Sequence, residues 1–230
     1  MKPLAIIVFS CFSTFISSQI CSCSEKPDLE DLISCRKTAF QNGAKIYWEF
    51  DCNSSWITFQ NGVLKKKIFE LDKTEIEFSG RLGYKSWTEF RNSFLIENSL
   101  VSGCCQPAEY ILYNKKNGNK ISDLGTFIFL EKTGKSPFVL TLVKNDDLLF
   151  TNLNDNRSYV VKIPKDKIEK TLENSDELYA EDLFQNVQIR NGSLSIELKY
   201  KASGKGKWKK QIITLDVTRA VNNDRHSALQ

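Results

Sequence analysis

Apolar and polar residues alternate along much of the chain, which is the pattern of β-strands that bury one face. Residues 193–200 show it most clearly, because Leu194, Ile196, Leu198 and Tyr200 fall on one face. From Ala44 onward, short runs rich in aromatic and β-branched residues recur, and such runs favour strands. The pattern predicts strands at 46–50, 56–59, 64–71, 94–97, 110–113, 126–130, 138–143, 148–152, 158–163, 193–200 and 211–217.

Asn-Gly pairs mark several turns in this pattern. They occur at 42–43, 61–62, 117–118 and 191–192, and three of them separate two strand-like runs. Asn-Gly accepts positive φ at both central positions, which a type I′ hairpin turn requires. We therefore predict an all-β, mainly antiparallel fold, a meander of hairpins with a few short helices.

The hairpins allow two arrangements, a propeller-like one and a sandwich. Strand–turn–strand segments at 46–71, 94–124, 138–163 and 187–217 recur at a spacing typical of propeller blades, although any antiparallel meander gives a similar pattern. Short helices are predicted at 26–37, at 86–89 from a capping-box pattern, and at 164–184.

The two ends of the chain differ from its β-rich part. Met1 and Lys2 precede an apolar run and then Ser17 and Ser18, which is the layout of a secretory signal peptide. We expect export to the periplasm, the cell surface or the medium. The expected regions are a signal peptide at 1–18, a cysteine-containing arm with a short helix at 19–43, a single β-rich domain at 44–217 and a flexible tail at 218–230.

Composition limits the partners. The net charge of +4 at pH 7 is too small to indicate a nucleic-acid partner. After the leader no apolar run approaches the roughly 18 residues that a membrane helix needs, so no transmembrane span is expected in the mature chain. A lipid anchor at Cys23 is an alternative, since Ile20-Cys21-Ser22-Cys23 loosely matches a lipobox. Other partners stay unknown.

Six cysteines follow the leader, and an even number in an exported chain favours disulfides. We expect Cys35 to pair with Cys21 or Cys23, and Cys52 to pair with Cys104 or Cys105. The two cysteines left over could then meet each other. A direct bond between the adjacent Cys104 and Cys105 would need a strained turn, and a soft-metal site is a further alternative.

No residue set stands out as catalytic, cofactor-binding or metal-binding. The single histidine, His226, lies in the predicted tail, where it cannot be held rigidly against a nucleophile or a metal ion. Several carboxylates could supply the acid/base pair of a glycoside hydrolase, although acids on a solvated surface are the commoner explanation. These carboxylates are Glu49, Asp51, Glu75, Glu77, Glu109, Asp146 and Asp147.

Two basic patches are present, at 65–67 and at 205–210, the second with Trp208 between its lysines. Such a patch could bind a polyanion or a sugar acid. The alternative is a charged hairpin tip, or an edge strand that lysines protect against pairing with another chain.

Three stretches, 19–27, 51–56 and 102–107, resemble uncharacterised exported proteins of flavobacteria, and the similarity extends over most of the exported chain. The resemblance implies a bacterial envelope or secreted protein that is cleaved near Gln19. It carries no known activity, so it assigns no functional residue. We expect an exported, non-enzymatic binding or structural protein of the bacterial envelope. The alternative is a carboxylate-dependent hydrolase that acts on polysaccharide.

Overall fold

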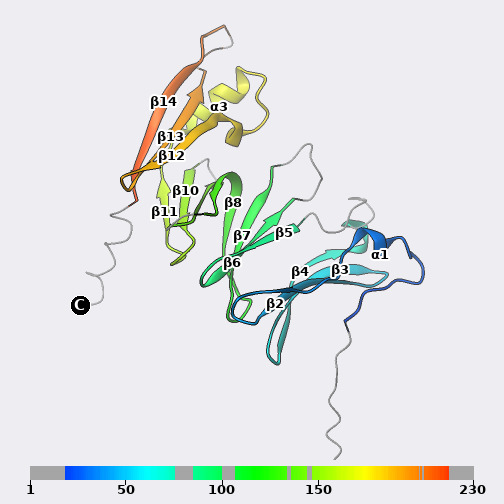
Figure 1. Cartoon of the computed structure of the whole chain (residues 1–230). Helices are drawn as coiled ribbons and strands as arrows, with labels where there is room; N and C mark the ends of the chain where they lie inside the picture. The colour runs from blue at the N-terminus through cyan, green and yellow to red at the C-terminus, as the bar shows by residue number, and fades with distance from the viewer. Residues whose placement is uncertain are drawn as a thin grey trace, which may run out of the picture.

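The computed structural model describes residues 19–75, 85–99, 107–133, 136–143, 147–201, 203 and 205–217. Their regular structure is almost entirely antiparallel β-sheet, with a few short helices (Figure 1). The prediction of an all-β, mainly antiparallel fold is therefore confirmed. The leader at 1–18 and the tail at 218–230, which includes His226, lie outside the described residues.

The strands form three sheets, in each of which the spatial order follows the order in the chain. The first sheet contains β1 (Thr38–Ala39), β2 (Lys45–Phe50), β3 (Ser54–Asn61) and β4 (Leu64–Asp72). The second contains β5 (Lys85–Glu89), β6 (Ser93–Asn98), β7 (Glu109–Asn114), β8 (Lys120–Glu131), β9 (Phe138–Val143), β10 (Asp147–Asn152) and β11 (Ser158–Val161). The third contains β12 (Phe184–Arg190), β13 (Ser193–Tyr200) and β14 (Lys209–Asp216).

The meander is thus divided unequally among the sheets. The predicted segments 94–124 and 138–163 belong to one continuous sheet, because β8 pairs with β9. They therefore do not form separate blades. One of the Asn-Gly turns has the predicted conformation: Asn191 and Gly192, between β12 and β13, have φ of 51° and 76°, the positive values that a type I′ turn needs. In the other three pairs only the glycine has a positive φ.

The seven-stranded sheet carries the two smaller sheets on the same face. Residues directly opposite each other in neighbouring strands share a face, and the pairs Phe94–Tyr113, Glu109–Thr126, Thr126–Leu142 and Leu142–Leu148 follow that face across the sheet. At the β6–β7 end it packs on the four-stranded sheet, and at the β9–β10 end on the three-stranded sheet and its helices. A strip over the middle strands lies between the two contacts.

The opposite face of the seven-stranded sheet has a core of its own, in which Leu95 and Leu112 are buried together with Val139 and Leu149. The sheet curls around this core. Asn92, in the β5–β6 turn, donates a hydrogen bond of 3.1 Å to the carbonyl of Asn154, in the β10–β11 turn. The curl therefore brings the turns from the two ends of the strand order together, although β5 and β11 remain edge strands.

Aromatic rings connect the first two sheets. Phe94 of β6 stacks between Phe59 of β3 and Tyr113 of β7, at centroid distances of 5.7 and 5.3 Å, and Phe40 packs on it at 5.1 Å. Each such pair is worth about 0.5–1.5 kcal/mol beyond the area that it buries. This stack fixes the four-stranded sheet on the β6–β7 end of the larger sheet.

The helices agree only in part with the sequence predictions. The segment 164–184 forms α3 (Lys165–Glu173) and the 3-10 helix η1 (Ala180–Leu183), as predicted. The segment 26–37 forms only the single turn α1 (Leu29–Leu32). The helix predicted at 86–89 is wrong, because these residues lie in β5, where Trp87 and Thr88 pair with Ile96 and Leu95 of β6. Tertiary pairing outweighs the local capping pattern there.

The N-terminal arm runs beside the end of β2. The backbone N–H of Phe50 donates to the carbonyl of Ile20 at 3.0 Å, and Cys21 forms a parallel bridge with Phe50. The side chain of Gln19 donates to the carbonyl of Cys35 at 2.6 Å. These contacts place the arm against the four-stranded sheet.

The course of the arm decides the cysteine pairing. Cys21 bonds to Cys35, which confirms one of the two expected partners. The expected bond from Cys52 to Cys104 or Cys105 is wrong, because Cys52 bonds to Cys23, with the Cα atoms 4.8 Å apart. Because Cys21 forms a parallel bridge with Phe50 at the end of β2, Cys23 lies beside the β2–β3 turn, which contains Cys52. Cys104 and Cys105 lie outside the described residues.

This pairing bears on the two membrane alternatives. A lipid anchor at Cys23 would need the sulfur that the disulfide uses, and Cys23 is only 3% exposed. No helix among the residues that the structure describes is long and apolar enough to cross a bilayer.

Candidate functional site

A hollow lies on the strip of the seven-stranded sheet between the two smaller sheets, and we call it the central cleft. Its volume is about 770 Å³, within the range of small-molecule sites. Strands β7, β8 and β9 form its floor and η1 one wall. The cleft is lined by Glu109, Tyr110, Ile111, Asp123, Gly125, Thr126, Leu142, Val143, Ala180 and Glu181.

The floor of the cleft depends on a local break in the sheet. Gly125 has a φ of +83°, and a Cβ at this position would overlap the carbonyl oxygen of Leu142. The register shifts on both sides of it, between Tyr110 and Ile111 and between Phe127 and Phe129. Such bulges bend a strand and redirect its side chains. Only glycine allows β8 to approach β9 this closely where the floor curves.

The cleft combines apolar and acidic groups. Ile111, Leu142 and Ala180 supply aliphatic surface, while Glu109, Asp123 and Glu181 supply carboxylates from three different elements. Asp123 also forms an exposed ion pair with Lys120 at 2.9 Å. Among the described residues, no three histidine, cysteine or acidic side chains are grouped so that they could hold a metal ion. The cleft therefore offers negative charge beside an apolar surface.

Two tyrosines near the cleft are held in the protonated form. Burial raises the pKa of Tyr113 to about 12, with a further contribution from the charge of Asp123. Burial and the neighbouring Glu97 also raise the pKa of Tyr110 strongly. The hydroxyl of Tyr113 donates to the carbonyl of Ile68 in β4 at 3.2 Å, so it ties the four-stranded sheet to β7. Neither phenol is poised to act as a base near neutral pH.

Among the described carboxylates that were singled out from the sequence, only Glu109 lies in the cleft. Asp51 accepts hydrogen bonds from the backbone of Asn53 and Ser54 in the β2–β3 turn. At the end of β4, the backbone N–H of Asp72 donates to the carboxylate of Glu75, and the backbone N–H of Glu75 donates to the carboxylate of Asp72. Asp147 pairs with Lys162. Glu77 and Asp146 lie outside the described residues.

Glu49 is the most buried of these carboxylates, and both of its oxygens are occupied. Oε1 accepts from Lys65 at 3.0 Å and from the backbone N–H of Ile20 at 3.2 Å. Oε2 accepts from Thr58 at 2.5 Å and from the indole N–H of Trp56 at 3.2 Å. The side chain is 1% exposed. Glu49 therefore joins the N-terminal arm to three strands of the first sheet.

The hydrogen bonds decide the charge state of Glu49. Burial alone would raise its pKa, but the bonds from Thr58, Lys65 and Ile20 outweigh burial and leave the pKa below its ordinary value. A general acid needs the opposite shift, so that it keeps its proton near neutral pH. Burial, with the charge of Glu49, also raises the pKa of Tyr47. Glu49 is thus suited to structure and not to acid catalysis.

The lysines of 65–67 lie in β4, and Lys209 and Lys210 of the second patch lie in β14. Both strands are edges of the two smaller sheets, as the edge-protection alternative predicts. In β4, each lysine of 65–67 has an acceptor: Lys65 bonds to Glu49, Lys66 to Asn119 and Lys67 to Glu70. The ammonium of Lys67 also lies 4.2 Å from the ring centre of Trp56. The patch at 205–210 leads into β14 and is more open.

Sequence reasoning missed Asp123, Glu181 and Gly125. A glycine inside a strand-like run is a recognised signal of a bulge or close backbone approach, so Gly125 could have been found. The two acids carry no such signal, because they reach the cleft only through the packing of η1 against the sheet. Comparison with known proteins adds no assignment: no family model matches the chain, and no curated protein matches it.

Proposed function

We propose that this is an exported, non-enzymatic binding protein of the bacterial envelope, and that its ligand occupies the central cleft. The ligand class that fits has an apolar body and a positively charged end. The observation that carries the proposal is the strip of sheet that no described helix or strand covers, where Ile111 and Leu142 lie beside the carboxylates of Glu109, Asp123 and Glu181. Apolar surface supplies affinity, and a few polar groups orient the ligand.

Export is supported by two observations of different kinds and by the resemblance expected from the sequence. The first eighteen residues have the layout of a signal peptide. Two disulfides link cysteines in the described chain, and disulfides are typical of oxidising compartments. The stretches around Gln19 and Cys52 resemble exported proteins of flavobacteria.

The chemistry of the site favours binding over catalysis. The one histidine of the chain is outside the described residues. Glu49, the most elaborately bonded carboxylate, has a lowered pKa and no oxygen left for a substrate. The acids of the cleft come without a described histidine, lysine or cysteine in its lining.

The test uses three probes with the same decyl chain: decylamine, decanol and decanoate, each below its critical micelle concentration. Calorimetric titration should show decylamine binding most tightly, decanol more weakly and decanoate least. The double variant Glu109→Gln/Glu181→Gln should bind decylamine more weakly and should bind decanol with unchanged affinity. The variant Thr126→Phe, in which the larger side chain fills the cleft, should bind neither decylamine nor decanol.

A matched control removes two exposed glutamates elsewhere. Glu30 lies on α1 and Glu169 on α3, and neither lines the cleft. Glu30→Gln/Glu169→Gln changes the net charge equally and should leave decylamine affinity at the original value. Equal loss in both double variants, or tightest binding of decanoate, would refute the proposed ligand class.

The second candidate is a carboxylate-dependent hydrolase acting on polysaccharide. It is favoured by one observation, the presence of three carboxylates in a single cleft. Turnover on a panel of glycans, lost in Glu109→Gln while the protein stays folded, would establish it in place of the binding function. No turnover, together with decylamine binding, would dismiss it.

A further inference from the structure

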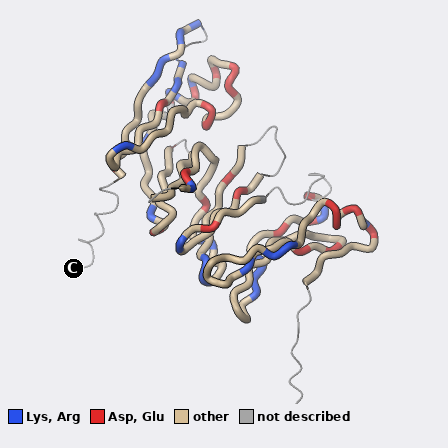
Figure 2. Tube along the Cα trace, viewed as in Figure 1, with Lys and Arg blue, Asp and Glu red and all other residues tan. Residues whose placement is uncertain are grey.

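The hairpin between β13 and β14 concentrates positive charge. Residues 199–210 contain six lysines and no acidic residue, and we call this segment the lysine hairpin. Figure 2 shows the basic residues gathered where β13 turns into β14, at the end of the three-stranded sheet. The central cleft lies on a different element of the fold, the seven-stranded sheet.

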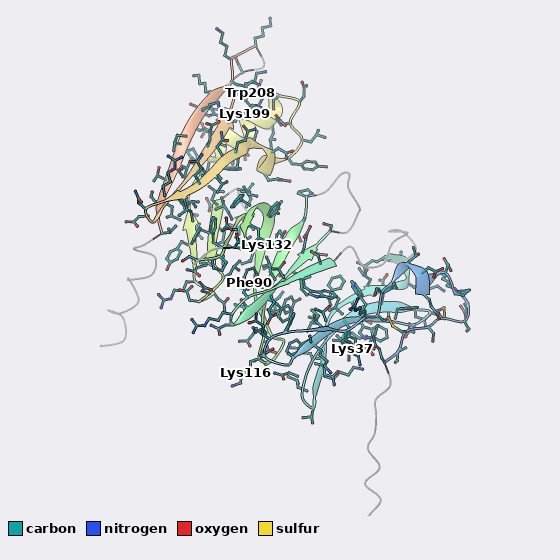
Figure 3. The ribbon with its side chains drawn as sticks, in the orientation of Figure 1. Lys37, Phe90, Lys116, Lys132, Lys199 and Trp208 are labelled. Carbon is teal, nitrogen blue, oxygen red and sulfur yellow. A yellow bond between two sulfur atoms is a disulfide. The ribbon has the colours of Figure 1, made fainter. Side chains whose placement is uncertain are left out.

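An exposed tryptophan sits among these lysines. The side chain of Trp208 is 37% exposed, whereas Trp48 and Trp56 are 4% and 7% exposed. The ammonium of Lys199 lies 4.0 Å from the ring centre of Trp208 (Figure 3). The ammonium of Lys201 lies 5.7 Å from the same ring centre. Ile212, which follows the lysine hairpin and lies on the same face of β14 as Lys210, is 61% exposed. The hairpin thus presents apolar groups within a cationic surface.

Several of the ammonium groups have no protein acceptor within the described chain. Lys199 bonds to Glu177 at 3.2 Å, and Lys210 pairs with Glu197 at 2.8 Å. Lys205, Lys207 and Lys209 are exposed, and no acceptor lies within bonding distance of them among the described residues. This differs from residues 65–67, in which every lysine is bonded.

We propose that the lysine hairpin docks the protein on an anionic lipid membrane surface. Tryptophan favours the headgroup region of a bilayer, and lysines near an anionic surface each add to the attraction. A projecting hairpin meets a flat surface, with Trp208 and Ile212 entering the headgroup layer while Lys205, Lys207 and Lys209 reach phosphates. Because Lys199 covers one face of the Trp208 ring, stacking on a sugar is hindered, which favours lipid over an acidic polysaccharide.

Sedimentation with lipid vesicles tests this assignment. The protein should bind vesicles in which half of the lipid is phosphatidylglycerol and not vesicles of phosphatidylcholine alone. Lys205→Gln/Lys207→Gln/Lys209→Gln should lower the partition coefficient on the order of 100-fold. The control Lys66→Gln/Lys120→Gln/Lys170→Gln removes the same charge from exposed positions in β4, β8 and α3 and should change it little.

Trp208 provides a second readout, independent of sedimentation. Tryptophan emission should shift to the blue when anionic vesicles are added, and the shift should disappear in Trp208→Phe. Binding to polygalacturonate with none to vesicles would overturn the proposal in favour of a polysaccharide partner. Equal loss in the two triple variants, or no binding to either partner, would also overturn it.

Discussion

The four-stranded and three-stranded sheets lie on the same face of the seven-stranded sheet, but they are held together in different ways. The four-stranded sheet is crosslinked to the N-terminal arm by the Cys23–Cys52 disulfide, and the Cys21–Cys35 disulfide closes a loop within the arm. This sheet also contains the buried Glu49. The three-stranded sheet packs on α3 and η1 through aliphatic side chains, among them Ile168, Leu183 and Ile196. No disulfide joins the described residues of that sheet.

The difference extends to the lysines. In β4 they bond to Glu49, Asn119 and Glu70, so charge contributes to cohesion within the protein. In the lysine hairpin, three ammonium groups face outward. Two similar runs of lysines can therefore have different roles. Lysines with acceptors beside them bond within the protein, whereas lysines without acceptors are left to interact with a partner.

Removing a disulfide should produce the largest difference in stability between the four-stranded and the three-stranded sheet. Cys23→Ala/Cys52→Ala opens a loop with a sequence separation of 29 residues. The chain-entropy model gives a loss of about 3.5 kcal/mol in the free energy of unfolding. Hydrogen exchange should show the loss in β2 and β3, while β13 keeps its protection. Equal loss of protection in β13 would show that the two sheets do not differ in this way.

Glu49→Gln should come next, with a loss of about 2 kcal/mol. The amide places an N–H₂ donor where the carboxylate accepts bonds, either toward Trp56 and Thr58 or toward Lys65 and Ile20. Denaturant unfolding measures the change. Glu197→Gln, in the three-stranded sheet, is the control and should cost much less.

A smaller effect should appear in the pH dependence of stability. The folded state lowers the pKa of Glu49, so the unfolded chain takes up the proton first as the pH falls. The stabilisation is therefore fully present above the ordinary pKa of 4.5 and is lost as the pH falls through the folded-state value. The free energy of unfolding, measured at a series of pH values from neutral to acidic, should fall less steeply in Glu49→Gln than in the original protein. The same pH dependence in both proteins would exclude Glu49 as its source.

The smallest effect should come from the lysine hairpin. Lys205→Gln/Lys207→Gln/Lys209→Gln should change the free energy of unfolding by less than about 0.5 kcal/mol, as expected for surface positions. Lys65→Gln should cost more, because it leaves the buried Glu49 without its cation. Thermal unfolding of the two variants side by side gives the contrast. A large loss in the triple variant would mean that these lysines support the fold.

The strands could be predicted because their signal is local. Alternation in 193–200 and the turn at Asn191-Gly192 depend on neighbouring residues alone, and both were correct. The strand at 85–89 was missed because its pairing with β6 is visible only in three dimensions. The division into three sheets likewise depends on how apolar faces meet, which alternation does not specify.

The cysteines and the cleft show the same limit at longer range. The number of cysteines predicted disulfides, but the partner of Cys52 depended on the course of the arm beside β2. Glu109 was a candidate carboxylate, whereas its neighbours Asp123 and Glu181 come from β8 and η1. Sequence reasoning therefore found residue types that suit a site but not the set that shares it.

The crosslinked arm has a consequence for the order in which the chain matures. Both disulfides close between Cys21 and Cys52, and these residues are synthesised before the strands of the two other sheets. The crosslinks need no partner from the rest of the protein, so they can form while later strands are still being synthesised. The aromatic stack on Phe94 can be completed only afterwards. The molecule is thus arranged to mature from its first sheet onward, with an early covalent anchor for the long-range contacts that follow.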